Sequence, residues 1–279
     1  MAALHSFRFH PSIFLCLVAS FCFSRTCFGS KAKHSNLTTF GTRWSWAGAT
    51  WYGSPDGAGS DGMECGACGY GNAVSQPPFS SMVTGIGPSL YKSGKECGAC
   101  YKIKCTKRMH PSCSGKPVRV IITDFCPGGP CATDSAHFDL SGTAFGAMAK
   151  AGEEVAFRDA GVLKIRYARV ACDYSGRTIA FHVDPGSNSN YFAAVIEYEE
   201  GDGDLAGVSL KEASMGPEEW RSMQQSWGAV WKLDAGSEMQ PPFSIRLTSQ
   251  YSRETIVAKN VIPENWKPGS TYRSLVNYL

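Results

Sequence analysis

Cysteines divide this chain of 279 residues into two parts. Nine follow Gly29, the last of them is Cys172, and none occurs in the more than one hundred residues beyond it. In a secreted protein, a cluster of this kind predicts disulfide bonds that reinforce a limited hydrophobic core. We therefore expect a cross-linked first domain and a second domain that folds without cysteines.

The first residues predict entry into the secretory pathway. Arg8 precedes a short apolar run at residues 13–23, and small residues follow it, which is the pattern of a cleaved signal peptide. The run is too short to span a bilayer, and no later segment is long and apolar enough to do so. Cleavage after Ser24 or after Gly29 would suit, and Gly29 is favoured. Asn36 begins an N-glycosylation sequon.

Charge and cysteine spacing exclude several classes of function. Removal of the signal peptide takes away Arg8 and Arg25 and leaves basic and acidic residues almost balanced, so no nucleic-acid partner is expected. The Cys65/Cys68 and Cys97/Cys100 pairs have the spacing of a four-cysteine zinc site. Behind a signal peptide disulfides are favoured, which also removes the thiolates that a Cys–His nucleophile would need. We expect no metal and no cofactor.

Hydrophobic patterning predicts β structure in both parts. In the first part, residues 118–122 and 162–170 are expected strands and 143–149 a short helix, which suggests a β barrel with small helices after a flexible polar lead-in. Five expected strands in the second part, separated by turn signals, predict a β sandwich: residues 179–183, 192–198, 229–233, 243–247 and 255–258. The acidic run from Glu199 to Asp204 lacks a calcium-loop pattern and is expected to be a solvated turn.

Four motifs, in this order, give the chain a specific resemblance. They are Ala49-Thr50-Trp51-Tyr52-Gly53, Cys97-Gly98-Ala99-Cys100-Tyr101, residues 136–146 around His137-Phe138-Asp139, and Ser226-Trp227-Gly228-Ala229-Val230-Trp231. The chain resembles the plant β-expansins, the branch of the expansin family that also holds the group-1 grass pollen allergens. The resemblance covers nearly everything after the first forty residues.

The resemblance implies a fold and a domain plan. A six-stranded double-psi β-barrel, similar to family-45 endoglucanases, would occupy residues 47–172, and an immunoglobulin-like β-sandwich carbohydrate-binding domain residues 179–279. A linker would occupy residues 173–178, a flexible segment 30–46 and the signal peptide 1–29. The family's disulfides would be Cys68–Cys97, Cys100–Cys172 and Cys105–Cys113, and Cys126–Cys131 would close a local loop. Cys65 is left over, and Cys27 could pair with it if cleavage follows Ser24.

The resemblance also implies a site. Asp139 matches the catalytic acid of the family-45 enzymes, and His137, two residues away in a strand, would share its face. A hydrolase normally needs a second carboxylate, for which Asp124 and Asp61 are candidates. Asp124 could instead only bond backbone amides, and His137 could be structural. Substrate contacts are expected from Thr50, Trp51, Tyr52 and Tyr101 in the barrel and from Tyr191 and Trp227 in the sandwich, with Trp231 in the core.

The expected function is wall loosening without bond cleavage. A secreted, monomeric protein of the plant cell wall would bind cellulose, arabinoxylan or another matrix glycan in a groove made by both domains, and would weaken noncovalent contacts between polymers. Two alternatives stay open. One is a polysaccharide endo-hydrolase that uses Asp124 or Asp61 as its second carboxylate. The other is a passive wall-binding protein.

Overall fold

The computed structural model describes residues 43–59, 66–174 and 176–278, and these ranges belong to one compact unit of the chain. The predicted signal peptide, the sequon at Asn36 and the residues Cys27, Asp61 and Cys65 lie outside the described residues. Within those ranges no helix is both long and apolar enough to cross a membrane.

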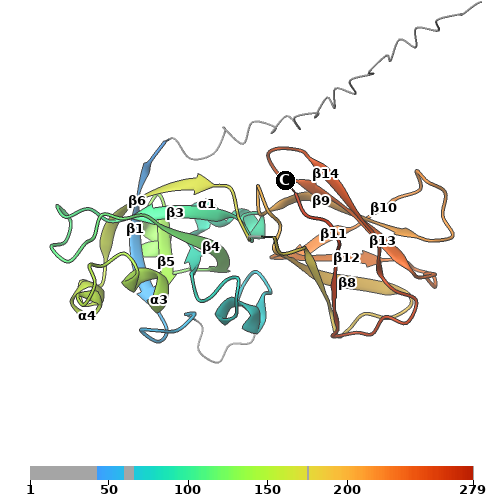
Figure 1. Ribbon diagram of the computed structural model, residues 1–279, viewed down its shortest axis with the longest axis horizontal. Helices are drawn as coiled ribbons and strands as arrows, with labels where there is room; N and C mark the ends of the chain where they lie inside the picture. The colour runs from blue at the N-terminus through green and yellow to red at the C-terminus, as the bar shows by residue number, and fades with distance from the viewer. Residues whose placement is uncertain (1–42, 60–65, 175, 279) are drawn as a thin grey trace, which may run out of the picture. The chain divides into compact units, whose positions relative to one another are not determined.

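Six strands of the first part close into a barrel in the order β1-β5-β2-β4-β3-β6 (Figure 1). Their bounds are Ser45–Tyr52 (β1), Val83–Ile86 (β2), Cys100–Lys104 (β3), Val118–Phe125 (β4), His137–Ser141 (β5) and Leu163–Val170 (β6). β1 runs parallel to β5 and β2 parallel to β4, whereas the other neighbours are antiparallel. This closed, mainly β arrangement is the double-psi barrel implied by the resemblance.

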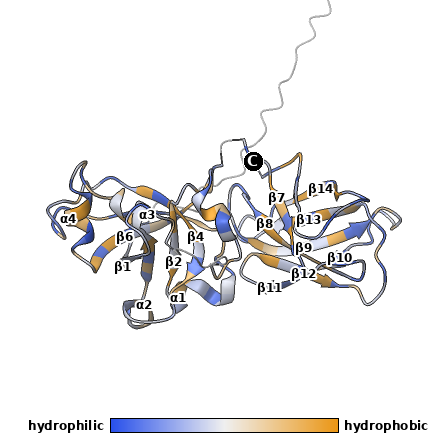
Figure 2. Ribbon diagram, turned by 90° about the horizontal axis from the view of Figure 1, so that it is seen from below, coloured by the Kyte–Doolittle hydropathy of each residue, from blue (hydrophilic) through white to orange (hydrophobic). Residues whose placement is uncertain are grey.

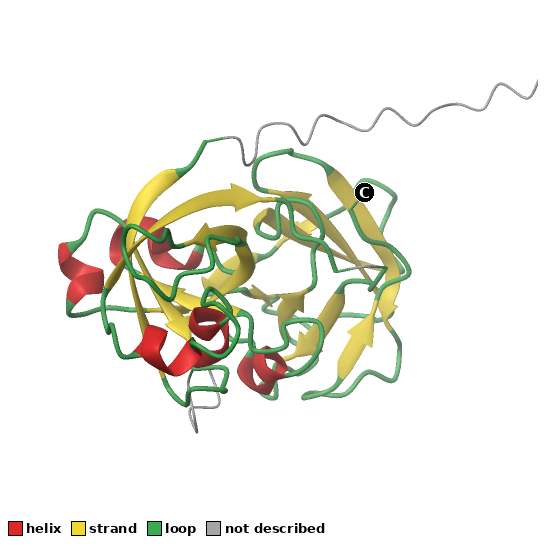
Figure 3. Cartoon of the chain, turned by 60° about the vertical axis from the view of Figure 1, so that its left-hand side comes forward, coloured by secondary structure: helices red, strands yellow, loops and turns green. Residues whose placement is uncertain are grey.

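Apolar residues that alternate along these strands fill the barrel. Ile103, Ile122 and Phe138 are fully buried, as are Phe145 and Phe157 from the short helices packed on it. The helical elements are η2 (Gly71–Ser75), α1 (Pro88–Tyr91), η3 (Lys92–Gly94), α2 (Pro130–Thr133), α3 (Gly142–Gly146) and α4 (Glu154–Arg158). All of them precede the second part, whose described strands are joined by loops and turns (Figure 3).

Four disulfides cross-link the first part. They are Cys68–Cys97, Cys100–Cys172, Cys105–Cys113 and Cys126–Cys131, the pairs expected from the sequence. The zinc interpretation fails for these residues, because Cys68, Cys97 and Cys100 are oxidised in disulfides and offer no thiolate.

The second part is a sandwich of two sheets. The four-stranded sheet has the order β10-β9-β13-β14 and the five-stranded sheet β11-β12-β8-β7-β15. The bounds are Ala180–Val183 (β7), Tyr191–Glu197 (β8), Leu205–Glu212 (β9), Arg221–Ser222 (β10), Gln224–Trp227 (β11), Val230–Asp234 (β12), Phe243–Ser249 (β13), Thr255–Ile262 (β14) and Thr271–Arg273 (β15). Apolar residues on these strands (orange in Figure 2) build a core that includes Phe181, Phe192 and Phe243.

Three expectations from the sequence need correction. β1 begins at Ser45, because Ser45 and Trp46 pair with Tyr167 and Arg166 of β6, so the predicted flexible segment 30–46 does not extend to residue 46. The helix expected at 143–149 ends at Gly146. The acidic run from Glu199 to Asp204 is no solvated turn: Glu199, Asp202 and Asp204 are buried, and Arg169 of β6 binds Asp204. In the second part, strands β9, β10, β11 and β15 were not predicted.

Candidate functional site

Strand register places the site residues in one row across the barrel. Thr50 of β1 pairs with Asp139 of β5, Asp139 pairs with Gly85 of β2, and Gly85 pairs with Asp124 of β4. The row thus carries a hydroxyl, a carboxyl, a position without a side chain, and a second carboxyl. Tyr52, two residues beyond Thr50 on the same face of β1, completes the group, because residues two apart on a strand share a face.

Asp139 is a partly buried carboxyl held from one side. The Thr50 hydroxyl lies 2.6 Å from Asp139 Oδ1 and donates a hydrogen bond to it. Burial raises the pKa of Asp139 above its usual value, and the nearby Asp124 raises it further, while the Thr50 hydrogen bond and His137 oppose the rise. Asp139 therefore keeps its proton to a higher pH than an exposed carboxyl does, as a hydrogen-bond donor or general acid requires.

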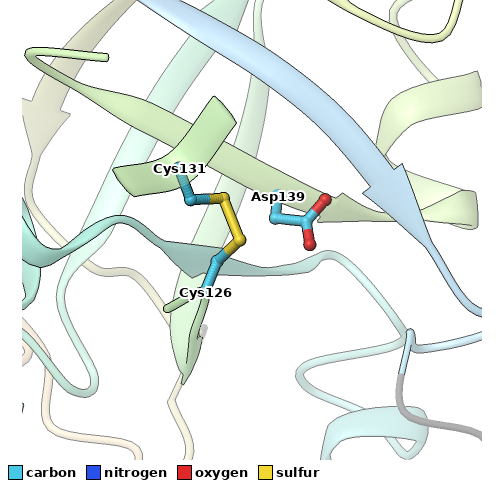
Figure 4. A group of neighbouring side chains, drawn as sticks. All are labelled: Cys126, Cys131 and Asp139. Carbon is cyan, nitrogen blue, oxygen red and sulfur yellow. A yellow bond between two sulfur atoms is a disulfide. The ribbon is translucent and has the colours of Figure 1, made fainter. Parts of the chain in front are cut away.

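The Cys126–Cys131 disulfide forms a wall beside Asp139 (Figure 4). The two sulfur atoms and a carboxylate oxygen of Asp139 all lie within 4.8 Å of one another. Three such groups could hold a metal ion if the cysteines were thiolates, but here the sulfurs are bonded to each other. The disulfide acts as an apolar neighbour that helps to keep water from one side of the carboxyl.

His137 stands behind Thr50 in the barrel wall. It shares a face with Asp139, as the spacing predicts, but its side chain is fully buried. Its Nε2 lies 2.9 Å from Thr50 Oγ1, and its Nδ1 lies 2.8 Å from Asp134 Oδ2. His137 therefore contacts Asp139 through Thr50 and is not positioned to touch a ligand in front of Asp139.

Asp124 is bound mainly by backbone amides. Its Oδ1 accepts hydrogen bonds from Ala67 N at 2.7 Å and from its neighbour Phe125 N at 2.8 Å. Its Oδ2 accepts a longer one, 3.4 Å, from the Tyr52 hydroxyl. These three bonds use most of the acceptor positions of the carboxylate. The modest role considered for this residue from the sequence, bonding backbone amides near the barrel mouth, describes its contacts well.

Tyr52 links the two ends of the row. Burial raises the pKa of its hydroxyl, and the charges of Asp124 and Asp139 raise it further, so the phenol stays protonated and donates to Asp124. Tyr91, which the sequence did not single out, supports the same corner: its hydroxyl donates to Ala67 O at 2.9 Å and its ring stacks on Phe125.

Two predicted substrate contacts lie away from this row. Tyr101 is 5% exposed, and its hydroxyl donates to the buried Glu96, so it is a core residue and the expectation of substrate contact is wrong. Trp51 alternates with Thr50 and Tyr52, so its indole faces the other way and donates to Arg158 O at 3.1 Å. Motif membership suggested both residues, but strand alternation and packing decide where they point. Asp61 lies outside the described residues.

The sandwich presents its predicted aromatics on one face of the five-stranded sheet. Tyr191, the first residue of β8, shares a face with Val195, which pairs with Val230, and Val230 pairs with Trp227. Trp227 is 42% exposed, whereas Trp231 is buried in the sandwich core, as expected. Gly69 of the first part lies against the Trp227 ring: a Cβ there would come within 3.1 Å of it. The Trp227 ring thus packs against Gly69 on one side and leaves part of its surface exposed.

The sequence analysis did not single out two residues that contact His137 in the barrel. Asp134 binds His137, and Gly48 leaves space for that pair, since a Cβ at Gly48 would lie 2.0 Å from Asp134 Oδ2. The available signal was weak: Asp134 lies only three residues before His137 in the chain, but nothing in the pattern shows that the loop folds back onto the ring.

Comparison with known proteins identifies the family. Residues 179–263 match the family model described as "Expansin C-terminal domain", and residues 83–167 match a model of the double-psi barrel described as "Lytic transglycolase". The chain is 55% identical to a putative expansin-B2 of Arabidopsis thaliana over 253 residues, which is 90% of each chain. It belongs to the expansin family.

Other relatives agree with this assignment. An expansin-B11 of Oryza sativa subsp. japonica is 55% identical over 252 residues, covering 88% of this chain and 83% of the relative. The crystal structure of the apo expansin of Clavibacter michiganensis superposes with a TM-score of 0.62 at 22% identity, covering 85% of this chain and 98% of the other. A mutant of that bacterial expansin in complex with cellohexaose gives a TM-score of 0.60 at 20% identity. At such low identity the bacterial structures support the fold of this expansin alone.

Proposed function

We propose that this expansin loosens the plant cell wall without cutting its polymers. It binds a glycan chain along the row from Thr50 to Asp124 and on the aromatic face of Trp227 and Tyr191, and weakens the noncovalent contacts of that chain with its neighbours. The expansin-B relatives and the bacterial expansin that was crystallised with cellohexaose support a wall polysaccharide as the ligand. On the same ground we expect the protein to be secreted into the plant cell wall.

The residues in the row suit a neutral glycan. Thr50, Tyr52 and Asp139 supply hydrogen-bond partners for sugar hydroxyls, while the exposed ring of Trp227 offers a flat apolar surface for the C–H face of a sugar. Many weak contacts of this kind shift the equilibrium between packed and separated polymers in favour of the bound, separated state. Such a process needs neither a cofactor nor a covalent step.

The state of Asp124 carries the proposal. Glycoside hydrolysis by two carboxyls requires that one of them activate water or attack carbon. Asp139 can serve as the acid, but the Asp124 carboxylate is already engaged by two backbone amides and by Tyr52. A carboxylate held this way is fixed in place and has little capacity left to take a proton from water. The row therefore binds and polarises a glycan better than it cleaves one.

The experiment is extension of heat-inactivated plant wall strips under constant load, with sugar release assayed in the same bath. Wild type, Asp139→Asn and the matched control Asp159→Asn, an exposed carboxylate on the loop after α4, would be compared. We expect extension without sugar release, retained in the control and lost in Asp139→Asn. Sugar release that depends on Asp139 would establish an endo-hydrolase, and wall binding with no extension by the wild type would establish a passive binding protein.

A further inference from the structure

Four side chains form a continuous hydrogen-bonded path through the barrel wall. Asp134 Oδ2 lies 2.8 Å from His137 Nδ1, His137 Nε2 lies 2.9 Å from Thr50 Oγ1, and Thr50 Oγ1 lies 2.6 Å from Asp139 Oδ1. The path follows the parallel pair β1–β5, in which His137 pairs with Gly48 and Asp139 pairs with Thr50. The His137 side chain is fully buried, whereas the Asp134 side chain, at one end of the path, is 42% exposed.

While Asp134 is ionised, counting hydrogens gives this path two complete states. Asp134 accepts a hydrogen bond from His137 Nδ1–H in both. When Asp139 is ionised, Thr50 donates its single hydroxyl hydrogen to Asp139, so His137 must donate from Nε2 and carries both ring protons. When Asp139 is protonated, it donates to Thr50, Thr50 donates to Nε2, and the ring is neutral. The two states differ only in the place of one proton and have the same total charge.

The exposed end of the path opens into a cavity separate from the glycan row. This cavity of 760 Å³ is lined by residues that include Trp46, Gly48, Asp134 and Lys164, and it shares none of its lining residues with the row of Thr50, Gly85, Asp124 and Asp139. Asp134 is thus accessible to solvent from a place that a bound glycan on the row does not cover.

Gly48 shows that the Asp134–His137 contact depends on a specific packing arrangement. A Cβ at this position would lie 2.0 Å from Asp134 Oδ2 and 2.5 Å from His137 Nδ1. Any larger residue would have to push the carboxylate or the ring aside. The strand therefore leaves room for this one ion pair at the position that pairs with His137.

We propose that Asp134 is a positioning residue that controls the protonation of Asp139 through His137 and Thr50. Its carboxylate stabilises the doubly protonated ring, which holds the shared proton on His137 and leaves Asp139 ionised. Without that carboxylate the proton moves by way of Thr50 onto Asp139. Only the effect of this inference on glycan binding rests on the proposed function, in which Asp139 is the carboxyl that contacts the glycan.

The other charged groups near the path do not produce the same effect. Asp139 also faces Asp124 and Tyr52, and Asp134 shares its cavity with Lys164. If Asp134 acted on Asp139 only through space, as Asp124 does, its removal would relieve a repulsion and make Asp139 ionise at a lower pH. The path predicts the opposite sign, so the direction of the change distinguishes the two explanations.

The test follows the Asp139 carboxyl carbon by NMR as a function of pH in the intact secreted protein, labelled with ¹³C-aspartate and free of glycan. Comparison with Asp139→Asn assigns the signal. We expect Asp134→Asn to raise the midpoint of the Asp139 titration by about half a pH unit or more. Gly48→Ala, which keeps every charge but separates the pair, is expected to raise it too, while Asp134→Glu stays closer to wild type and Asp159→Asn matches it.

The NMR shifts of the His137 ring nitrogens supply a second readout. If Asp134 had only a structural role, these shifts would not change together with the Asp139 titration. In Asp134→Asn the ring is expected to lose its second proton as Asp139 gains one. A midpoint that falls or stays unchanged in folded Asp134→Asn would overturn the inference. Because no wall is present in this measurement, its outcome does not depend on whether the protein extends walls. In wall strips, an upward shift of the pH profile in Asp134→Asn is the functional counterpart.

Discussion

Arg169 of β6 binds Asp204, just before β9, with Nη2 2.6 Å from Oδ1. The same nitrogen donates to Asp202 O at 3.0 Å, and Nη1 binds the buried Glu96. Two buried carboxylates thus share one guanidinium. Burial raises the pKa of Asp204 to about 7, and the charges of Glu96 and Asp202 add to the rise, although Arg169 opposes it. This contact joins a barrel strand to the acidic run that precedes β9, the third strand of the sandwich in chain order.

Buried acids predict that this protein is more stable in mild acid than in mild base. Burial raises the pKa of Glu199 to about 8 and that of Glu197 to about 7, as for Asp204. A carboxyl whose pKa is higher in the folded state stabilises the fold fully below its unfolded pKa, and this contribution is lost as pH rises through the folded value. The melting temperature should therefore fall as pH rises from about 5 to about 8.

Glu199→Gln tests this explanation directly. The amide does not titrate, so the variant should lose part of the pH dependence, and at alkaline pH it should be more stable than wild type. Glu200→Gln changes an adjacent carboxyl and should leave the melting curve as in wild type. A wild-type melting temperature that rises steadily toward pH 9, or identical curves for both variants, would contradict the assignment.

The acidic run illustrates what the sequence could not predict. Acidic residues between glycines indicate a solvated turn when only neighbours in the chain are considered. The cation that receives Asp204 is Arg169, 35 residues earlier and on another sheet, and no local pattern contains that pairing. Strand β9 was missed for a related reason: Leu205–Glu212 mixes glycine and serine among its apolar residues, and its burial comes from pairing with β13.

The site residues that share a strand face could be predicted from the sequence. The residue that a loop brings back to the site, Asp134, could not. His137 and Asp139 share a strand face, so their proximity follows from their spacing. Thr50 and Asp124 came from family motifs, and strand register brings them into the same row. Asp134 acts on His137 only because the chain after α2 turns its carboxylate toward the ring. Tyr101 was expected at the ligand because it adjoins a cysteine motif, whereas alternation along β3 directs it into the core.

Two glycines where the chain crosses itself predict a large packing effect. Gly98 has a φ of +88°, and a Cβ there would lie 2.2 Å from Gly203 O, while a Cβ at Gly203 would lie 2.5 Å from Gly98 O. Gly98→Ala should cost about 3 kcal/mol or more, since it combines backbone strain with a clash against backbone. Gly152→Ala has a similar φ, +82°, and open space around it, so about 1 kcal/mol is expected. Denaturant unfolding of both variants measures the difference, and equal losses would show that the close approach is unimportant.

We predict that the Cys126–Cys131 disulfide helps to raise the pKa of Asp139. Replacing both partners, as Cys126→Ser with Cys131→Ser, would exchange an apolar wall for two hydroxyls and admit water to the carboxyl. Since burial is the main cause of its raised pKa, the pKa of Asp139 should fall toward the usual value. Carboxyl ¹³C titration of the double variant measures the change. The Cys105–Cys113 disulfide, which the structure places outside the row, offers the matched control, and its double serine variant should leave the Asp139 titration in place if the fold persists.

The sandwich face predicts which exposed tryptophan binds the wall. Trp227 is 42% exposed on the face that also carries Tyr191, whereas Trp46 is 55% exposed on the barrel, where Arg166 lies over its ring. Trp227→Ala should weaken binding to insoluble cellulose by roughly tenfold, because a stacked aromatic ring contributes on the order of 1 kcal/mol beyond its buried area. Trp46→Ala removes a ring of greater exposure and should leave binding within about twofold of wild type, as expected of a surface substitution away from the ligand. Depletion isotherms on washed cellulose compare the two, with Tyr191→Ala expected between them. Equal losses for Trp46 and Trp227 would mean that exposed aromatic area alone governs adsorption, and a loss confined to Trp46 would move the binding face to the barrel.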